Sequence, residues 1–276
     1  MTKIAPFSAV WREIWQRFEA KNAVFIACGV IGSLPTVLIG IFMPESSITA
    51  WGSNVITYIT LIICAVLWSA LASMVIFAVT AYPQLSVSDA VRSMTSRGWA
   101  YITTGLLQSL IILGPILLVI GSLTFVGSQA LNQSFHGNDT SPAILGTTLV
   151  LLICIIPYSF WAYRFFFSGF IVFVEQKANM AAIKASYTMT RGRLGEIWGK
   201  FLTYWLVVFG ISIGLSIIEG IATAVFPHDS ALLPYVHGLF SLLSNTLTLP
   251  LSALFIAVLY AAVKQANEQS VENPTA

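Results

Sequence analysis

The chain has 276 residues, of which 57% are hydrophobic and only 9% are charged. Soluble domains carry about 25% charged residues, so this composition excludes a water-soluble globular protein and predicts an integral membrane protein. The net charge of +2 decides little, because what matters in a membrane protein is the side on which each Lys and Arg lies.

Residues 5–21 predict an amphipathic helix at the start of the chain. Its apolar residues recur at helical spacing and share one face: Phe7, Trp11, Ile14, Trp15 and Phe18. Two tryptophans on that face favour a position at the lipid headgroup boundary. The alternative is an ordinary helix whose apolar face packs on the rest of the protein.

Six apolar segments predict six transmembrane helices in an all-α, polytopic bundle. Their approximate bounds are 23–43, 55–82, 100–126, 144–174, 194–226 and 239–263. The fourth is longer than a ~30 Å hydrocarbon layer requires at ~1.5 Å per residue, so we expect it to tilt or to break at Ser168-Gly169. Small residues four positions apart predict close packing of the first, fifth and sixth spans. Residues 1–264 are therefore the predicted membrane domain, and the polar tail 265–276 is expected to be disordered.

Two further surface helices are predicted between spans. The first begins near Ser86, which has capping-box spacing to Asp89, and the second covers 179–190. The order surface helix, span, span thus occurs three times, starting near Ser8, Ser86 and Asn179. This order indicates three repeated two-span units, although interfacial composition shared by three loops would produce the same pattern.

The basic residues predict the orientation. Twelve of the thirteen Lys and Arg residues lie before the first span, between the second and third, between the fourth and fifth, or after the sixth. The connections on the opposite side contain none, so the positive-inside rule places both termini in the cytoplasm. The expected location is the cytoplasmic (inner) membrane of a prokaryote, which the protein crosses several times.

Two charged residues lie in predicted spans away from their first turns. Arg164 is close to a membrane surface, where its long side chain can reach the headgroups, and Glu219 lies near the other surface, where it can stay hydrated or pair with His228. His228, Asp229 and His237 are the only set that could converge on a metal ion, and no metal-binding motif accompanies them. We therefore predict no catalytic, cofactor or metal site.

The strongest functional indication is a group of basic residues between the fourth and fifth spans, which we call the basic collar. It consists of Lys177, Lys184, Arg191, Arg193 and Lys200. Each such residue near the cytoplasmic leaflet is worth ~1 kcal/mol of attraction to anionic lipid. The collar therefore predicts contacts with anionic phospholipids, whereas a role in setting topology alone needs the same charges and no ligand.

The same region resembles a known family. An apolar strip from Ile171 to Glu175 is followed by the Ala-rich segment Ala181–Ser186 and by Met189-Thr190-Arg191-Gly192-Arg193, with Ile197 beyond it. This pattern resembles the membrane domain of glycerophosphoryl diester phosphodiesterases and related six-span bacterial inner-membrane proteins. The segment from Leu243 to Tyr260 is similar to the last span of the second group. In the phosphodiesterases a separate soluble domain carries the catalysis, and this chain has no room for one, so the resemblance implies no enzymatic activity.

The expected function is that of a non-enzymatic membrane scaffold, a partner subunit or a lipid-organising module. The alternative is a transporter or lipid carrier that uses the proline-kinked spans together with Arg164 and Glu219. An intramembrane enzyme built on the three residues that could hold a metal ranks last. Membrane lipids, anionic phospholipids among them, and a membrane-protein partner are the expected partners, and nucleic acid is not.

Overall fold

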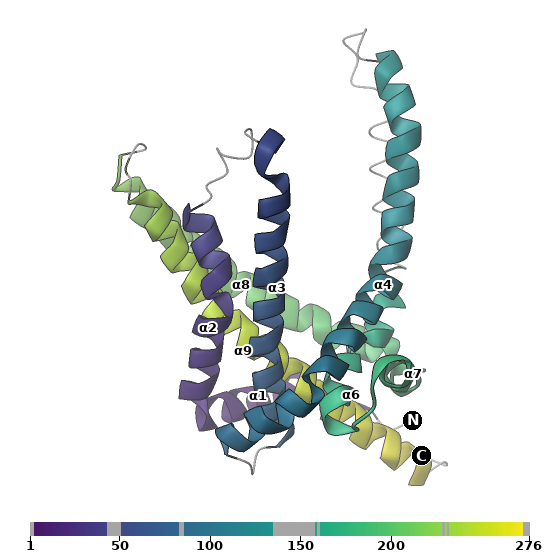
Figure 1. Ribbon diagram of the computed structural model, residues 1–276. Helices are drawn as coiled ribbons and strands as arrows, with labels where there is room; N and C mark the ends of the chain where they lie inside the picture. Colours follow the sequence, from purple (N-terminus) through teal and green to yellow (C-terminus); the bar gives the residue numbers. More distant parts are fainter. Residues whose placement is uncertain are drawn as a thin grey trace. The chain divides into compact units, whose positions relative to one another are not determined.

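The computed structural model in Figure 1 describes residues 3–42, 51–82, 86–134, 158, 161–227, 230 and 232–272, and these residues form helices and no strand. The elements are α1 (Phe7–Ala20), α2 (Asn22–Phe42), α3 (Trp51–Ala81), α4 (Val87–Ser134), the short 3₁₀ helix η2 (Tyr163–Phe165), α6 (Ser168–Val174), α7 (Asn179–Thr190), α8 (Leu194–Ala224) and α9 (Leu233–Glu272). The chain divides into two compact units, one formed by Met1–Trp99 with Gly199–Ala276 and the other by Ala100–Trp198.

Four helices in the described part of the chain are long and apolar enough to cross a membrane. They cover Asn22–Phe42, Thr60–Ala81, Leu194–Ala224 and Leu233–Val271. These segments correspond to the first, second, fifth and sixth predicted spans, so the all-α, membrane-type bundle is confirmed. The predicted span 100–126 lies within α4, and most of the predicted span 144–174 lies outside the described residues. The count of six spans and the threefold repeat therefore stay predictions.

The core of the first unit is built by α2, α3 and α9, which pack against one another, with α1 against α9. Val10, Ile14 and Phe18 are buried along one edge of α1, while Trp15 stays 46% exposed. The helix predicted at 5–21 is thus confirmed, and its inner edge packs on protein. Its outer edge keeps a tryptophan in the position that suits a headgroup boundary.

Each proline in this core leaves a backbone carbonyl without its helical partner. Pro35 frees the carbonyl of Ile31 in α2, and the Trp68 indole N–H of α3 donates to that oxygen at 2.7 Å. Pro250 frees the carbonyl of Thr246 in α9 in the same way. Because unpaired backbone groups are costly in lipid, the contact to the first carbonyl stabilises the α2–α3 pair where the proline weakens α2.

Gly29 of α2 lies directly against the freed carbonyl of α9. A Cβ atom at this position would stand 2.4 Å from the carbonyl oxygen of Thr246, which is closer than side chains approach in real structures. The two helices therefore pack closely, as their small residues predicted. The small residues of α8 behave differently, since a Cβ on Gly210 or Gly214 would meet nothing within 4 Å.

The start of α4 shows Ser86 in the predicted N-cap position, with Asp89 bonded to its hydroxyl. The Ser86 hydroxyl lies 2.5 Å from the Asp89 carboxylate, and the backbone N–H of Asp89 donates to the Ser86 hydroxyl at 3.2 Å. The prediction of a surface helix that ends before the third span was wrong, because α4 runs without interruption for 48 residues. Gly98 is the only helix-weakening residue at the expected boundary, and a single glycine costs a helix about 1 kcal/mol without ending it.

The C-terminal segment also differs from the expectation. We predicted a disordered tail from residue 265, but α9 continues through Glu272. The side chains of Val263 and Ala266 are buried, so the core extends past the last predicted span. The residues that follow include Glu268, Gln269 and Glu272, which favour a helix, and no Gly or Pro, so the helix continues beyond that contact.

Candidate functional site

The second unit contains a broken helix where the sequence predicted an overlong fourth span. η2 ends at Phe165, two turn residues follow, and α6 begins at Ser168, next to the predicted break. The hydroxyl of Ser186, on α7, lies at this break. It donates to the carbonyl of Arg164 at 2.8 Å and accepts from the backbone N–H of Phe167 at 3.2 Å. One buried side chain thus satisfies a donor and an acceptor at the place where the helix is interrupted.

A second set of hydrogen bonds holds the beginning of α7 against α4. Asn179 has a φ of 51°, a left-handed conformation that asparagine tolerates better than most residues. Its backbone N–H donates to the Thr104 hydroxyl at 2.8 Å, and its side-chain oxygen accepts from the Thr103 hydroxyl at 2.7 Å. Because both threonines belong to the same turn of α4, they fix the position and the direction of α7 together.

The sequence motif between α6 and α8 is explained by this packing. The inner face of α7 consists of Ala182, Ile183, Ser186 and Thr190, all of them buried. α7 packs with this face against η2 and α6, and Ile171 and Phe173 of α6 are fully buried. At the far end Gly192 adopts a φ of 81°, which a residue with a side chain would reach only with strain. The motif therefore encodes a helix docked on the interrupted helix formed by η2 and α6.

The opposite face of α7 is exposed and carries both apolar and basic side chains. This exposed face consists of Met180, Lys184, Tyr187, Thr188 and Arg191, which recur at helical spacing. Met180 is 46% exposed and Tyr187 is 38% exposed. A helix with basic and large apolar side chains on one outer face is typical of the membrane interface.

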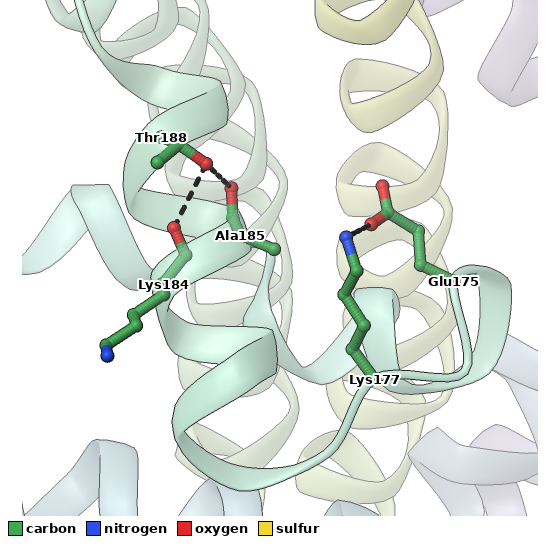
Figure 2. A network of polar contacts seen from close by, with 5 residues as sticks. All are labelled: Glu175, Lys177, Lys184, Ala185 and Thr188. Carbon is green, nitrogen blue, oxygen red and sulfur yellow. Dashed lines mark hydrogen bonds and ion pairs between the residues drawn. The ribbon is translucent and has the colours of Figure 1, made fainter.

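The basic residues of this region fall into two groups. Lys177 forms an ion pair with Glu175, with 2.6 Å between the ammonium nitrogen and a carboxylate oxygen (Figure 2). The Lys184 side chain extends away from the helix in the same view. Within the described residues, Lys184 and Arg191 form no ion pair. These two exposed residues therefore keep their full charge available for an external anion.

Two members of the basic collar are placed differently from the others. Arg193 is only 5% exposed, just before the start of α8, so its side chain does not share the exposed surface of Lys184 and Arg191. Its position directly follows the turn at Gly192. Lys200 lies on the part of α8 that belongs to the first unit. The lipid contacts of both residues stay a prediction.

Arg164 is engaged with α7 instead of with a separate polar group. Its guanidinium carbon lies 4.8 Å from the centre of the Tyr187 ring, which is a cation–π contact. The residue is half-buried, and Phe165 beside it stacks on the same ring with 6.3 Å between ring centres. The contact agrees with a side chain that lies along the surface and joins η2 to α7.

Glu219 pairs with a histidine, as predicted, but with a different one. Its carboxylate oxygen lies 2.5 Å from Nδ1 of His237 on α9, whereas His228 and Asp229 lie outside the described residues. Among the described residues no three His, Cys, Asp or Glu side chains gather as a metal site would require. The pair joins the ends of α8 and α9 within the first unit.

The sequence missed the residues that position α7. Asn179 lies about 75 residues beyond Thr103 and Thr104 in the chain. The contact between them follows from the fold alone. The one available signal was Asn179 itself, because asparagine is enriched in left-handed positions at the ends of helices.

Comparison with known proteins gives a family and no activity. No curated protein and no solved structure matches the chain. Residues 20–266 match a family model described as a domain of unknown function, DUF7847. Since the match covers most of the sequence, including every helix from α2 to α8 and nearly all of α9, the chain belongs to the DUF7847 family.

Proposed function

We propose that this protein is a non-enzymatic, multi-pass membrane protein that gathers anionic phospholipids at one leaflet through the exposed face of α7. The proposed location is the prokaryotic inner membrane, with both termini in the cytoplasm. The observation that carries the proposal is the pair of exposed cations Lys184 and Arg191, which form no ion pair with another described residue, on a helix whose outer face also carries large apolar side chains. The phosphate oxygens of the lipid headgroups would pair with the two cations. Met180 and Tyr187 would contact the lipid at the boundary between headgroups and acyl chains.

Lipid binding at this place is supported by the way α7 is held. Its inner face is buried and anchored at Ser186 and Asn179, so the helix does not have to order itself when a lipid binds. A preorganised surface loses less entropy on binding than a mobile one. The resemblance to phosphodiesterase membrane domains belongs to the same proposal, as a membrane module that serves a soluble or membrane-embedded partner.

The alternative of a transporter has less support from the geometry. The two residues that favoured a pathway are each engaged in a local contact, Arg164 with Tyr187 and Glu219 with His237. Neither contact needs a substrate to explain it. The lipid-gathering role is therefore the better account of the charged residues in the described part of the chain.

The test is native mass spectrometry of the full chain, extracted gently from membranes that contain phosphatidylglycerol and phosphatidylcholine. Replacing Lys184 and Arg191 by glutamine removes ~1 kcal/mol of attraction each, so the preference for the anionic lipid should fall by about 30-fold. The matched control replaces the exposed residues Arg92 and Lys264 by glutamine, which removes the same charge elsewhere. Equal loss in both double variants would show that net charge alone acts, and would refute the proposed site.

A further inference from the structure

The first unit contains a partly open cavity of about 230 Å³ between α2, α3 and α9, and most of its lining residues have polar side chains. Its polar lining consists of five hydroxyl side chains and one amide: Ser33, Thr36, Ser69, Thr248, Ser252 and Asn245. These residues come from three apolar helices that are long enough to cross a membrane. Such a concentration of polar groups inside a membrane bundle needs a physical explanation.

The cavity lies deep in the predicted hydrocarbon layer. Ser33 is 12 residues from Lys21, and Ser69 is 13 residues from Tyr82, where α2 and α3 end on their basic side. At ~1.5 Å per residue both hydroxyls are about 18 to 20 Å inside, past the middle of a ~30 Å layer. The exposed side chain of Thr36 borders the cavity, so the cavity reaches the surface of the unit.

The hydrogen bonds already made in the cavity leave a defined set of groups for a ligand. Ser33 donates to the carbonyl of Gly29 at 2.7 Å, and Ser69 donates to the carbonyl of Gly32 at 2.9 Å. Their protons are therefore committed, and these two hydroxyls offer acceptor lone pairs. The Ser252 hydroxyl is shared with Tyr204 of α8 at 2.7 Å.

Three other lining side chains are uncommitted. Thr36, Thr248 and Asn245 form no side-chain hydrogen bond to another described residue, so the cavity keeps two hydroxyls and a complete amide group. The amide alone supplies two donors and one acceptor. A polar group that lacks a hydrogen-bond partner inside the membrane costs free energy. A ligand that both donates and accepts hydrogen bonds would remove this cost.

The absence of charge in the lining limits the class of ligand. No Lys, Arg, Asp, Glu or His borders the cavity, so neither an anion nor a cation would find a neutralising partner there. The volume is larger than the 150 Å³ cavity in another protein that holds benzene, and it is below the ~300 Å³ at which drug-sized pockets begin. The space thus suits an uncharged molecule of roughly six to nine non-hydrogen atoms.

The walls of the cavity are fixed before any ligand enters. At Gly32, which also borders the cavity, a Cβ would stand 2.6 Å from the Cβ of Ala72 and 3.0 Å from Leu249. α2, α3 and α9 therefore meet at close range at this side of the cavity. A preformed cavity binds a small ligand with little cost of rearrangement.

We propose that this cavity binds a small uncharged polyol, a molecule with neighbouring hydroxyl groups that each donate and accept a hydrogen bond. Asn245 and Thr248 supply the donors and acceptors that recognise it, and Ser33 and Ser69 accept from it. The polyol is either free, as in glycerol, or the glycerol portion of a neutral lipid such as diacylglycerol, which enters from the bilayer beside Thr36. The proposal does not depend on the lipid contacts of α7.

The test uses the full chain in detergent micelles, with two probes that separate the two sources. Saturation-transfer NMR measures the binding of free glycerol, and native mass spectrometry measures retained diacylglycerol. The variants are Thr248→Val and Asn245→Leu, which keep the shape of the side chains and remove their hydrogen bonds. Each should weaken the binding by about three- to tenfold. Thr203→Val, on the exposed surface of α8, is the matched control.

Saturable polyol binding that both variants weaken supports the free ligand, and retained diacylglycerol that both variants lose supports the lipid-borne one. If one variant fails to fold, the other still decides, because each removes a separate partner. Binding of neither probe, or binding that the variants and Thr203→Val leave at the wild-type level, overturns the proposal and leaves the cavity to water. Loss of phosphatidylglycerol in the collar variants has a separate readout and does not affect this result.

Discussion

Replacing Ser186 by alanine tests whether its hydroxyl holds η2 and α6 together. The side chain is fully buried and bridges the carbonyl of Arg164 and the N–H of Phe167. The substitution removes the one hydroxyl that serves both backbone groups, and the smaller side chain creates no clash. Each buried backbone group that loses its partner costs about 1 to 3 kcal/mol. The Thr190 hydroxyl, at 3.5 Å from the same carbonyl, is too distant to replace the lost bond. We therefore expect the two groups together to cost about 2 to 6 kcal/mol of stability.

The measurement is hydrogen–deuterium exchange of the full chain in nanodiscs, followed residue by residue from 161 to 190. The amides of α6 and α7 should exchange at least tenfold faster in Ser186→Ala, because local opening becomes easier there. The control is Thr188→Ala, whose hydroxyl is exposed and bonds to its own helix, to the carbonyls of Lys184 and Ala185 (Figure 2). Protection that is the same in both variants would refute the bridging role.

The core of the first unit allows three related predictions, each measured by thermal unfolding in nanodiscs. Gly29→Ala should cost at least about 2 kcal/mol, because its Cβ would stand 2.4 Å from the carbonyl oxygen of Thr246; wild-type stability would show that α2 and α9 are not in close contact. Trp68→Phe should cost about 1 kcal/mol by removing the donor to the Ile31 carbonyl. In a Pro35→Ala background that cost should shrink, since the restored N–H takes over the carbonyl; an undiminished cost would contradict this account of the kink.

Apolar length was enough to predict most of the spans from the sequence. α2 covers Asn22–Phe42 where residues 23–43 were expected, and α8 begins at the predicted Leu194. The break beside Ser168 was also foreseeable, because small residues interrupt a run that is too long for the membrane. These features depend on local composition, which the sequence shows directly.

Features that depend on contacts between distant segments could not be predicted in this way. The charge pattern predicted that Arg193 shares an exposed surface with the other residues of the basic collar. Its burial depends instead on the turn at Gly192 and on the packing at the start of α8. The pairing of Glu219 with His237 required the crossing of α8 and α9. The polar cavity was invisible for the same reason, since its six polar side chains look like scattered exceptions in three apolar runs.

The hydroxyl bridge between η2 and α6 has a consequence for the order in which the protein is made. Phe167 and Arg164 find their partner 19 and 22 residues later in the chain, so the bridge can form only after Ser186 has been synthesised. At ~5 to 20 residues per second this interval lasts about 1 to 4 seconds. A chain that stops before α7 therefore lacks the side chain that pairs these two backbone groups.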